Sequence, residues 1–181
     1  MRIITGAYRG RRLGSPKDLS VRPTSDKVKE AIFSMIAQEI DQTVVLDLFA
    51  GTGSLGLEAL SRGAKHCYFV DNDRESVRLI KSNIGQCKAE TESTVLVGDF
   101  KYGLSRIKEP IGIAFLDPPY RTDILDEALL IVSEEGFMAP DGLVVTEHGP
   151  KKIMPESIGV LEKIKEKKYG TVYVTIYRAT T

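Results

Sequence analysis

The sequence has few cysteines and no long hydrophobic run, and each shortage excludes a class of protein. Cys67 and Cys87 show neither C-x-x-C spacing nor a nearby pair of histidines, so no zinc or redox site is indicated. No apolar run approaches the roughly 20 residues that span a bilayer, and the segment MRIITGAYRGRR lacks the hydrophobic region of a signal peptide. We therefore expect a cytoplasmic protein with no metal and no membrane segment.

Charge is balanced over the chain but unevenly distributed along it. Residues 1–29 carry eight basic and two acidic side chains, and residues 151–181 carry seven and three. Residues 30–150 carry ten basic and twenty acidic side chains. Two basic ends around an acidic middle favour a polyanionic partner contacted at the edges, although charge alone also fits solvated ends.

The spacing of apolar segments predicts one α/β domain. Near-continuous apolar strands that alternate with helices are typical of a parallel sheet covered on both faces. The expected strands are 44–49, 67–70, 94–97, 111–116 and 143–146, and the expected helices are near 54–62, 74–87, 99–107 and 123–133. Residues 160–169 and 171–178, separated by Gly170, predict a closing antiparallel hairpin. The fold class is Rossmann-like, with a mostly parallel seven-stranded sheet.

The N-terminal part divides into a basic arm and the start of this domain. We assign residues 1–24 to the arm, with a short β-hairpin over 2–13, and residues 25–181 to the Rossmann-like domain. A helix over 25–40 should open the domain, because five apolar positions recur on one helical face. They are Val28, Ala31, Ile32, Met35 and Ile36.

A glycine-rich turn followed by an acid indicates a nucleoside-binding site. In VVLDLFAGTGSLG (44–56), Gly51, Gly53 and Gly56 satisfy G-x-G-x-x-G between a strand and a helix. Gly51 and Gly53 permit positive φ and a close approach of ligand to backbone. Asp71 lies 20 residues beyond Gly51, the spacing of a carboxylate that accepts hydrogen bonds from a ribose diol. The alternative, a tight strand-to-helix turn that binds no ligand, accounts less well for the glycine loop and the acid occurring together.

Two further acids favour S-adenosylmethionine over a dinucleotide. Asp47, four residues before the first glycine, would repel a pyrophosphate but suits the ammonium group of a methionine moiety. Asp99, after the third expected strand, is placed to accept a hydrogen bond from an adenine amino group. With Asp71, these carboxylates favour a cationic sulfonium ligand.

The tetrapeptide Asp117-Pro118-Pro119-Tyr120 indicates methyl transfer to an amino group. Two prolines end the fourth strand and make the chain turn rigidly at the C-terminal edge of the sheet, where ligands bind in such folds. The Asp117 carboxylate and the Pro118 carbonyl can then accept one hydrogen bond each from the two N–H groups of an exocyclic amino group. These hydrogen bonds localise the lone pair on the nitrogen. Tyr120 offers an aromatic face for a base taken out of its stack.

These motifs resemble a known family over almost the whole chain. FAGTGSLGLEALSRGA followed by DPPY resembles amino-methyltransferases acting on DNA or RNA, and RIITGAYRGRRL with RPTSDKVKEAIFSMI resembles the RsmD-type 16S ribosomal RNA guanine-N2 methyltransferases. The resemblance implies a class I methyltransferase acting on 16S ribosomal RNA or a small-subunit particle, and we expect a monomer. It implies catalytic roles for Asp117, Pro118, Pro119 and Tyr120. It implies cofactor contacts from Asp47, Phe49, Gly51, Gly53, Asp71, Asn72, Asp99 and Phe100.

The basic arm is the candidate RNA-binding element. Guanidinium groups match phosphate geometry, and Tyr8 among them can stack on an unpaired base. The candidate RNA-binding residues are Arg2, Arg9, Arg11, Arg12, Arg22 and Thr24, the last two placed near the site by the resemblance alone. A solvated segment that only caps the sheet is the alternative.

Two other functions remain open from the residues. A DNA adenine-N6 methyltransferase uses the same tetrapeptide, but this chain has little room for a domain that reads DNA sequence. A nucleotide-binding or RNA-binding module without catalysis would have no chemical need for residues 117–120.

Overall fold

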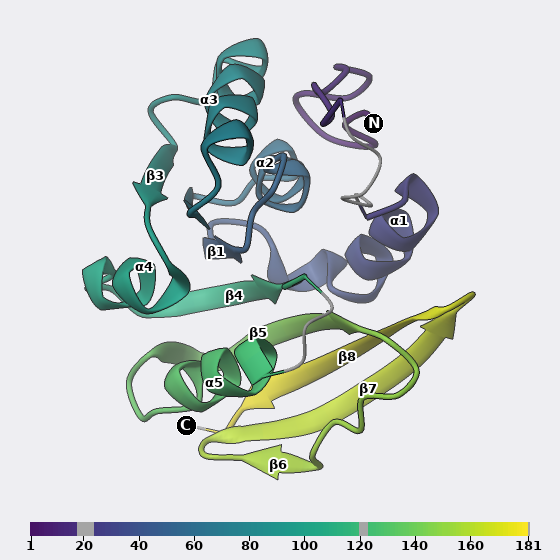
Figure 1. The fold of residues 1–181 in the computed structure, drawn as a ribbon, viewed down its shortest axis with the longest axis vertical. Coiled ribbons are helices and arrows are strands. Elements are labelled where there is room, and N and C mark those ends of the chain that lie inside the picture. Colours follow the sequence, from purple (N-terminus) through teal and green to yellow (C-terminus); the bar gives the residue numbers. More distant parts are fainter. Residues whose placement is uncertain (18–23, 120–122, 181) are drawn as a thin grey trace.

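The computed structural model of the chain describes residues 1–17, 24–119 and 123–180, which form one sheet with helices on both faces (Figure 1). The strands are β1 (Val44–Leu48), β2 (His66–Asp71), β3 (Ser93–Val97), β4 (Ile111–Leu116), β5 (Met138–His148), β6 (Ser157–Ile158), β7 (Leu161–Tyr169) and β8 (Val172–Ala179). The helices are α1 (Asp26–Met35), α2 (Ser54–Ser61), α3 (Arg74–Cys87), α4 (Phe100–Arg106) and α5 (Asp123–Val132).

Strand order defines the fold class. Among the described residues the sheet runs β3-β2-β1-β4-β5-β8-β7-β6, with β3 to β5 parallel and β8, β7 and β6 antiparallel. The order reverses between β1 and β4, which is the point where open α/β sheets bind ligands. The predicted Rossmann-like sheet with a C-terminal antiparallel hairpin is therefore confirmed.

Three details differ from the sequence prediction. The seven expected strands are present, and the two-residue strand β6 adds an eighth. The helix expected over 25–40 ends at Met35 and continues as a 3-10 turn at Ala37–Glu39. The hairpin expected over 2–13 is a looped segment closed by one isolated bridge between Arg2 and Arg12, because Gly6 and Gly10 take positive φ and turn the chain away from extended structure.

The sheet separates two hydrophobic cores. The first core lies under α1, α2 and α3, and the second lies under α4 and α5. Alternation along β1 shows the division, since Val45 packs in the first core while Leu46 and Leu48 pack in the second. Asp47 alternates with Leu46 and Leu48 and therefore lies on the first-core side.

The N-terminal segment is part of the first core. Ile3 and Leu13 are buried there, and Figure 1 shows residues 1–17 beside α1 and α2, far from β6 to β8. The buried face of α1 is rotated from the predicted one: Lys29 and Phe33 are fully buried, while Ala31 is only half-buried. Lys29 is buried because it bonds to the arm that covers it.

Neither a candidate membrane span nor a candidate metal-binding cluster is present among the described residues. No helix in residues 1–17, 24–119 and 123–180 is long and apolar enough to cross a membrane. In the same ranges, no group of three His, Cys, Asp or Glu side chains is arranged to hold a metal ion.

Candidate active site

The glycine turn after β1 has the geometry of a ligand cradle. Gly51 and Gly53 have φ of 60° and 78°, in the left-handed region, and Gly53 is the N-cap of α2. A Cβ at Gly51 would meet nothing within 4 Å, so the space beside this backbone is open. A Cβ at Gly56 would lie 2.4 Å from the Phe69 ring, so this glycine lets α2 pack closely on β2.

Asp71 is tied to the glycine turn. Its Oδ2 accepts a hydrogen bond from the Gly51 amide at 2.9 Å, and its Oδ1 accepts one from the Asp73 amide at 2.9 Å. Burial raises the pKa of this half-buried carboxyl. Each carboxylate oxygen can accept a further hydrogen bond, so the group can still receive a ribose diol.

Asp47 is a buried acid next to this turn. It is 2% exposed, and its Oδ2 accepts a hydrogen bond from the Gly56 amide at 2.9 Å. Burial raises its pKa well above the usual value, and the nearby carboxylates of Asp117 and Asp71 raise it further. A cation beside Asp47 would relieve this repulsion.

The ends of β4 and β5 place two more acids together. Phe115 of β4 pairs with Val145 of β5, and both side chains belong to the first core. Asp117 and Glu147 stand two residues further along each chain, so side-chain alternation sends both to the same face as Asp47.

Thr24 joins the two acids. Its hydroxyl lies 3.1 Å from Asp117 Oδ2 and 2.9 Å from Glu147 Oε1 and donates to them, just before the Ser25 N-cap of α1. Burial raises the pKa of Asp117 to about 6. Burial, followed by the charge of Asp117, raises the pKa of Glu147 well above its usual value. These carboxyls, with Asp47, form the acid cluster of the site.

Glu147 is not among the site residues predicted from the sequence. The signal was present, because Glu147 follows the expected strand 143–146 as directly as Asp117 follows 111–116. It was overlooked because no two-proline turn marks it. No physical reason for a hydroxyl at Thr24 was evident from the sequence. In the structure, this hydroxyl is the group that bonds Asp117 and Glu147.

The remaining cofactor candidates lie around the turn. Phe49 has φ of 63° and packs against Phe100, with ring centroids 5.6 Å apart. Asp99 is exposed and caps α4 by accepting a hydrogen bond from the Tyr102 amide at 2.8 Å. Asn72 is exposed beside Asp71.

The tetrapeptide is described in part. Strand β4 ends at Leu116, and of the two prolines that follow Asp117, Pro118 is buried and Pro119 is exposed. Tyr120 lies outside the described residues, as does Arg22 of the arm.

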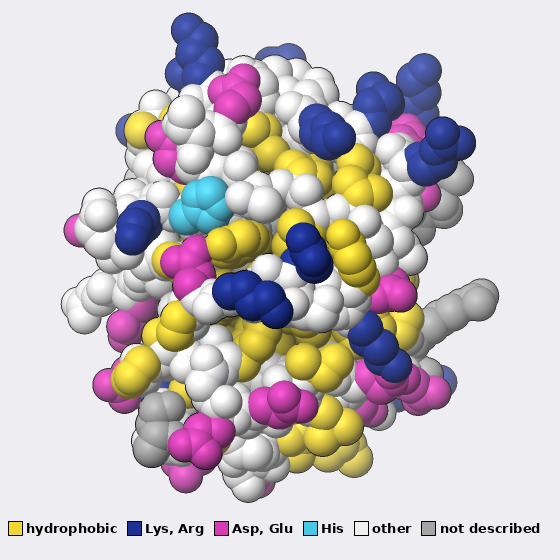
Figure 2. All heavy atoms as spheres, turned by 90° about the vertical axis from the view of Figure 1, so that its left-hand side faces the viewer, with side chains coloured by type: hydrophobic (Ala, Val, Ile, Leu, Met, Phe, Trp, Pro, Cys, Tyr) yellow, Lys and Arg dark blue, Asp and Glu magenta, His cyan; other side chains and the backbone are white. Residues whose placement is uncertain are grey.

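The candidate arginines of the arm differ in their surroundings. Arg2, Arg9 and Arg12 are exposed. Arg11 is half-buried, donates to the Gln86 carbonyl at 3.2 Å and lies over the Tyr8 ring at 5.2 Å. On the side of the molecule where β3 and α4 lie, Figure 2 shows Lys and Arg scattered among Asp and Glu. Several Lys and Arg side chains lie near one another at the upper right of this view.

The donor set fits S-adenosylmethionine. The open space at Gly51 admits a ligand against the backbone, Asp71 can accept from a ribose diol, and the buried acid Asp47 suits a positively charged group. Strand order, glycine turn and acid cluster together define a Rossmann-like S-adenosylmethionine-dependent methyltransferase.

Comparison with known proteins gives the family. The chain belongs to the family described as "Conserved hypothetical protein 95", which matches residues 1–178. It is 33% identical to ribosomal RNA small subunit methyltransferase D of Escherichia coli, over 98% of this chain and 89% of that protein. It is 40% identical to a Bacillus subtilis protein provisionally named rRNA methyltransferase YlbH, over 98% of each. These matches confirm the resemblance to the RsmD-type family.

Solved structures agree with this assignment. An Escherichia coli protein provisionally named methyltransferase yhhF superposes with a TM-score of 0.89 at 33% identity, over 99% of this chain and 98% of that one. A Haemophilus influenzae protein provisionally named a methylase superposes with a TM-score of 0.82 at 32% identity, over 99% and 98%.

Proposed function

We propose that this protein transfers a methyl group from S-adenosylmethionine to the exocyclic N2 amino group of a guanine in 16S ribosomal RNA. The observation that carries the proposal is the Asp117 carboxyl directly after β4, joined to Glu147 by Thr24, beside a glycine turn suited to the cofactor. We propose the Pro118 carbonyl as the second acceptor for the amino group. Relatives that the chain matches over 93% and 89% of their own length carry the name ribosomal RNA small subunit methyltransferase D, which supports the choice of RNA.

The residues of the chain act mainly by preorganised electrostatics. When bound, S-adenosylmethionine supplies an electrophilic methyl group on a positively charged sulfur. Asp117 and the Pro118 carbonyl accept hydrogen bonds from the two N–H groups of the amino group. They also stabilise the positive charge that develops on its nitrogen. Loss of such a partner typically lowers the rate by ~10²–10³. Because its pKa is about 6, Asp117 is ionised near neutral pH and can take the proton that the nitrogen loses.

The arm supplies the contact with the polymer in this proposal. The exposed guanidinium groups of Arg2, Arg9 and Arg12 can pair with phosphates, while Tyr8 packs against the first core. We propose a monomer that works in the cytoplasm, where ribosomal subunits are assembled.

Transfer of radioactive methyl groups tests the proposal. The protein would be incubated with tritiated cofactor and 16S ribosomal RNA, free or in small subunits, from cells that lack the modification. Digestion to nucleosides should yield N2-methylguanosine, and Asp117→Ala should abolish transfer while cofactor binding persists. A product that is N6-methyladenosine, preferentially in DNA, would replace the proposal with the adenine enzyme. Absence of transfer to any nucleic acid would favour a binding module.

A further inference from the structure

We propose that Glu147 selects guanine by accepting the hydrogen bond of its N1–H, next to the amino group held by Asp117. This inference rests on the proposed function and names the residue that distinguishes guanine from other purines with an amino group. The groups that recognise the base then include a residue of the neighbouring strand β5 as well as the tetrapeptide.

Geometry puts the two acids at neighbouring positions. One hydroxyl, that of Thr24, lies within 3.1 Å of Asp117 Oδ2 and 2.9 Å of Glu147 Oε1. The residues follow adjacent parallel strands at the same level, because Leu116 pairs with Thr146 directly before them. Strands in a sheet are about 4.8 Å apart, so two atoms of one base edge can reach both carboxylates.

The hydrogen-bond pattern of the pair matches guanine. From N2 to N1, a guanine edge presents only donors: two N–H bonds on the amino group and one on the ring nitrogen. Adenine presents its amino donors next to N1, which is an acceptor. The Thr24 hydroxyl has one proton to share between Asp117 and Glu147, so the two carboxylates keep spare acceptor positions toward a base. Two adjacent acceptors favour two adjacent donors.

Burial makes the choice strict. Glu147 is 6% exposed, so a ring nitrogen that offers no proton would be placed against a buried acceptor with little water to replace the missing hydrogen bond. Sites built to hydrogen-bond a substrate group reject analogues that lack it far more strongly than hydrophobic pockets reject a missing methylene. Asp117 and Asp47 are the charged groups that face Glu147, and their negative charges raise its pKa, an effect that a hydrogen bond from a donor such as N1–H opposes.

A base analogue separates the N1 contact from the chemistry at N2. 2,6-Diaminopurine keeps the N2 amino group, but its N1 is an acceptor. Single-turnover rates would be measured on ligated 16S ribosomal RNA carrying guanine or 2,6-diaminopurine at the methylated position. Wild-type protein should prefer guanine by about 100-fold. Glu147→Gln offers an amide N–H to the analogue and should reduce this preference to below about 10-fold. Glu134→Gln, an exposed change outside the site, should leave the preference intact.

The outcomes distinguish the inference from the function on which it rests. No methylation of the guanine substrate by wild-type protein would defeat the proposed function itself. Methylation of guanine and diaminopurine at equal rates by wild-type protein would overturn the role of Glu147 without any variant. A Glu147→Gln protein that is slower on both bases by the same factor would also overturn it, since a merely structural role slows both equally.

Discussion

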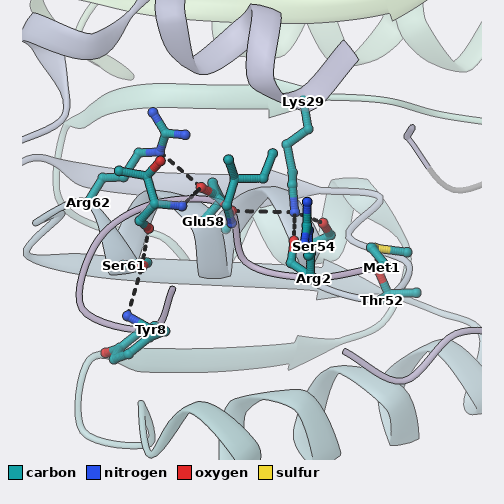
Figure 3. A network of polar contacts seen from close by, with 12 residues as sticks. Met1, Arg2, Tyr8, Lys29, Thr52, Ser54, Glu58, Ser61 and Arg62 are labelled. Carbon is teal, nitrogen blue, oxygen red and sulfur yellow. Dashed lines mark hydrogen bonds and ion pairs between the residues drawn. The ribbon is translucent and has the colours of Figure 1, made fainter. Parts of the chain in front are cut away.

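Lys29 Nζ of α1 lies 3.4 Å from Glu58 Oε2 of α2, and neither side chain is exposed to solvent. Figure 3 shows this ion pair within a polar network beneath the N-terminal segment. Lys29 donates to the Arg2 carbonyl at 2.6 Å and to Ser54 Oγ at 3.0 Å. Glu58 also accepts the Ile4 and Thr5 amides, at 2.9 and 3.1 Å. The pair thus fastens the arm to the Rossmann-like domain.

Removal of the lysine charge should loosen the arm. Lys29→Met leaves Glu58 buried with one cation fewer, which typically costs about 3 kcal/mol and should lower Tm by roughly 6–12 °C in thermal unfolding. The amides of Ile4 and Thr5 should exchange with deuterium faster. Lys27→Met, an exposed change in the same helix, is the matched control and should change Tm little. Equal Tm values for the two variants would contradict a stabilising role for the ion pair.

Two glycines in helices should respond to alanine in opposite ways. At Gly56, an added methyl group would lie 2.4 Å from Phe69 and 2.6 Å from Cys67 Sγ, so Gly56→Ala must push α2 away from β2 and should destabilise by about 1–3 kcal/mol. At Gly85 in α3 the nearest atom is 3.8 Å away, so Gly85→Ala should stabilise by about 0.5–1 kcal/mol. Urea unfolding measures both changes. Equal effects at the two sites would show that α2 is not closely packed.

Cofactor binding should release protons. The pKa values of Asp47, Asp117 and Glu147 are all raised, so this cluster holds protons to higher pH than ordinary carboxyls do, and a bound cation lowers these pKa values. Affinity for S-adenosylmethionine should therefore rise several-fold from pH 5.5 to pH 7.5. Calorimetry in buffers of different ionisation enthalpy measures the release directly. S-adenosylhomocysteine, which lacks the sulfonium charge, should release fewer protons. A binding enthalpy that does not depend on buffer would refute the linkage.

The ionised Asp117 carboxylate, which the proposed reaction needs, should lower the stability of the folded protein. Its folded pKa of about 6 exceeds the ordinary 3.8, so below pH 3.8 the group is protonated in both states and has no effect. As pH rises from 3.8 to about 6, the Asp117 carboxyl ionises in the unfolded state before it ionises in the folded state, so the free energy of unfolding falls. Above about pH 6 this loss of stability is constant. Asp117→Asn should regain about 1–2 kcal/mol at pH 8, raising Tm by roughly 2–8 °C, and the gain should vanish near pH 4.

The exposed Asp141→Asn is the control for this variant, because asparagine tolerates the left-handed backbone at that position. The wild-type transfer rate should fall as pH drops below about 6, as the Asp117 carboxylate is protonated. A rate that is flat between pH 5 and pH 7 would contradict the assigned role.

The exposed arginines should act on RNA without acting on the fold. Combined Arg9→Ala and Arg12→Ala should weaken RNA binding and reduce the slope of log K against log salt by about 1.4–1.8. The free energy of unfolding should change by less than about 0.5 kcal/mol. Arg11→Ala removes the bond to the Gln86 carbonyl and the contact with Tyr8, so it should cost about 1 kcal/mol of stability. Unchanged RNA affinity in the double variant would make the arm a structural cap.

The regular elements follow from local patterns, and this explains how much of the fold the sequence predicts. Helix α3 occupies 74–87 and strand β4 occupies 111–116, as predicted, because periodicity and capping are local properties. The contact between Gly51 and Asp71 was predictable too, because two adjacent parallel strands set it.

Contacts between distant segments were not predictable in the same way. Lys29 lies next to the apolar face of α1 and looks like an ordinary surface lysine, because its partner Glu58 lies 29 residues along the chain. The bridge from Thr24 to Glu147 spans 123 residues and depends on how α1 docks on the sheet. Side-chain polarity within a helix does not reveal a buried partner in another element.

The acid cluster lies on one side of the sheet. All members of the acid cluster lie on the first-core side, whereas the second core is made by residues such as Leu125, Leu129 and Tyr177. Changes in that second layer can adjust melting temperature without altering the electric field around the reacting nitrogen. Adaptation of this fold to warmer or colder surroundings therefore has a route through α5 and β8 that leaves the carboxylates undisturbed.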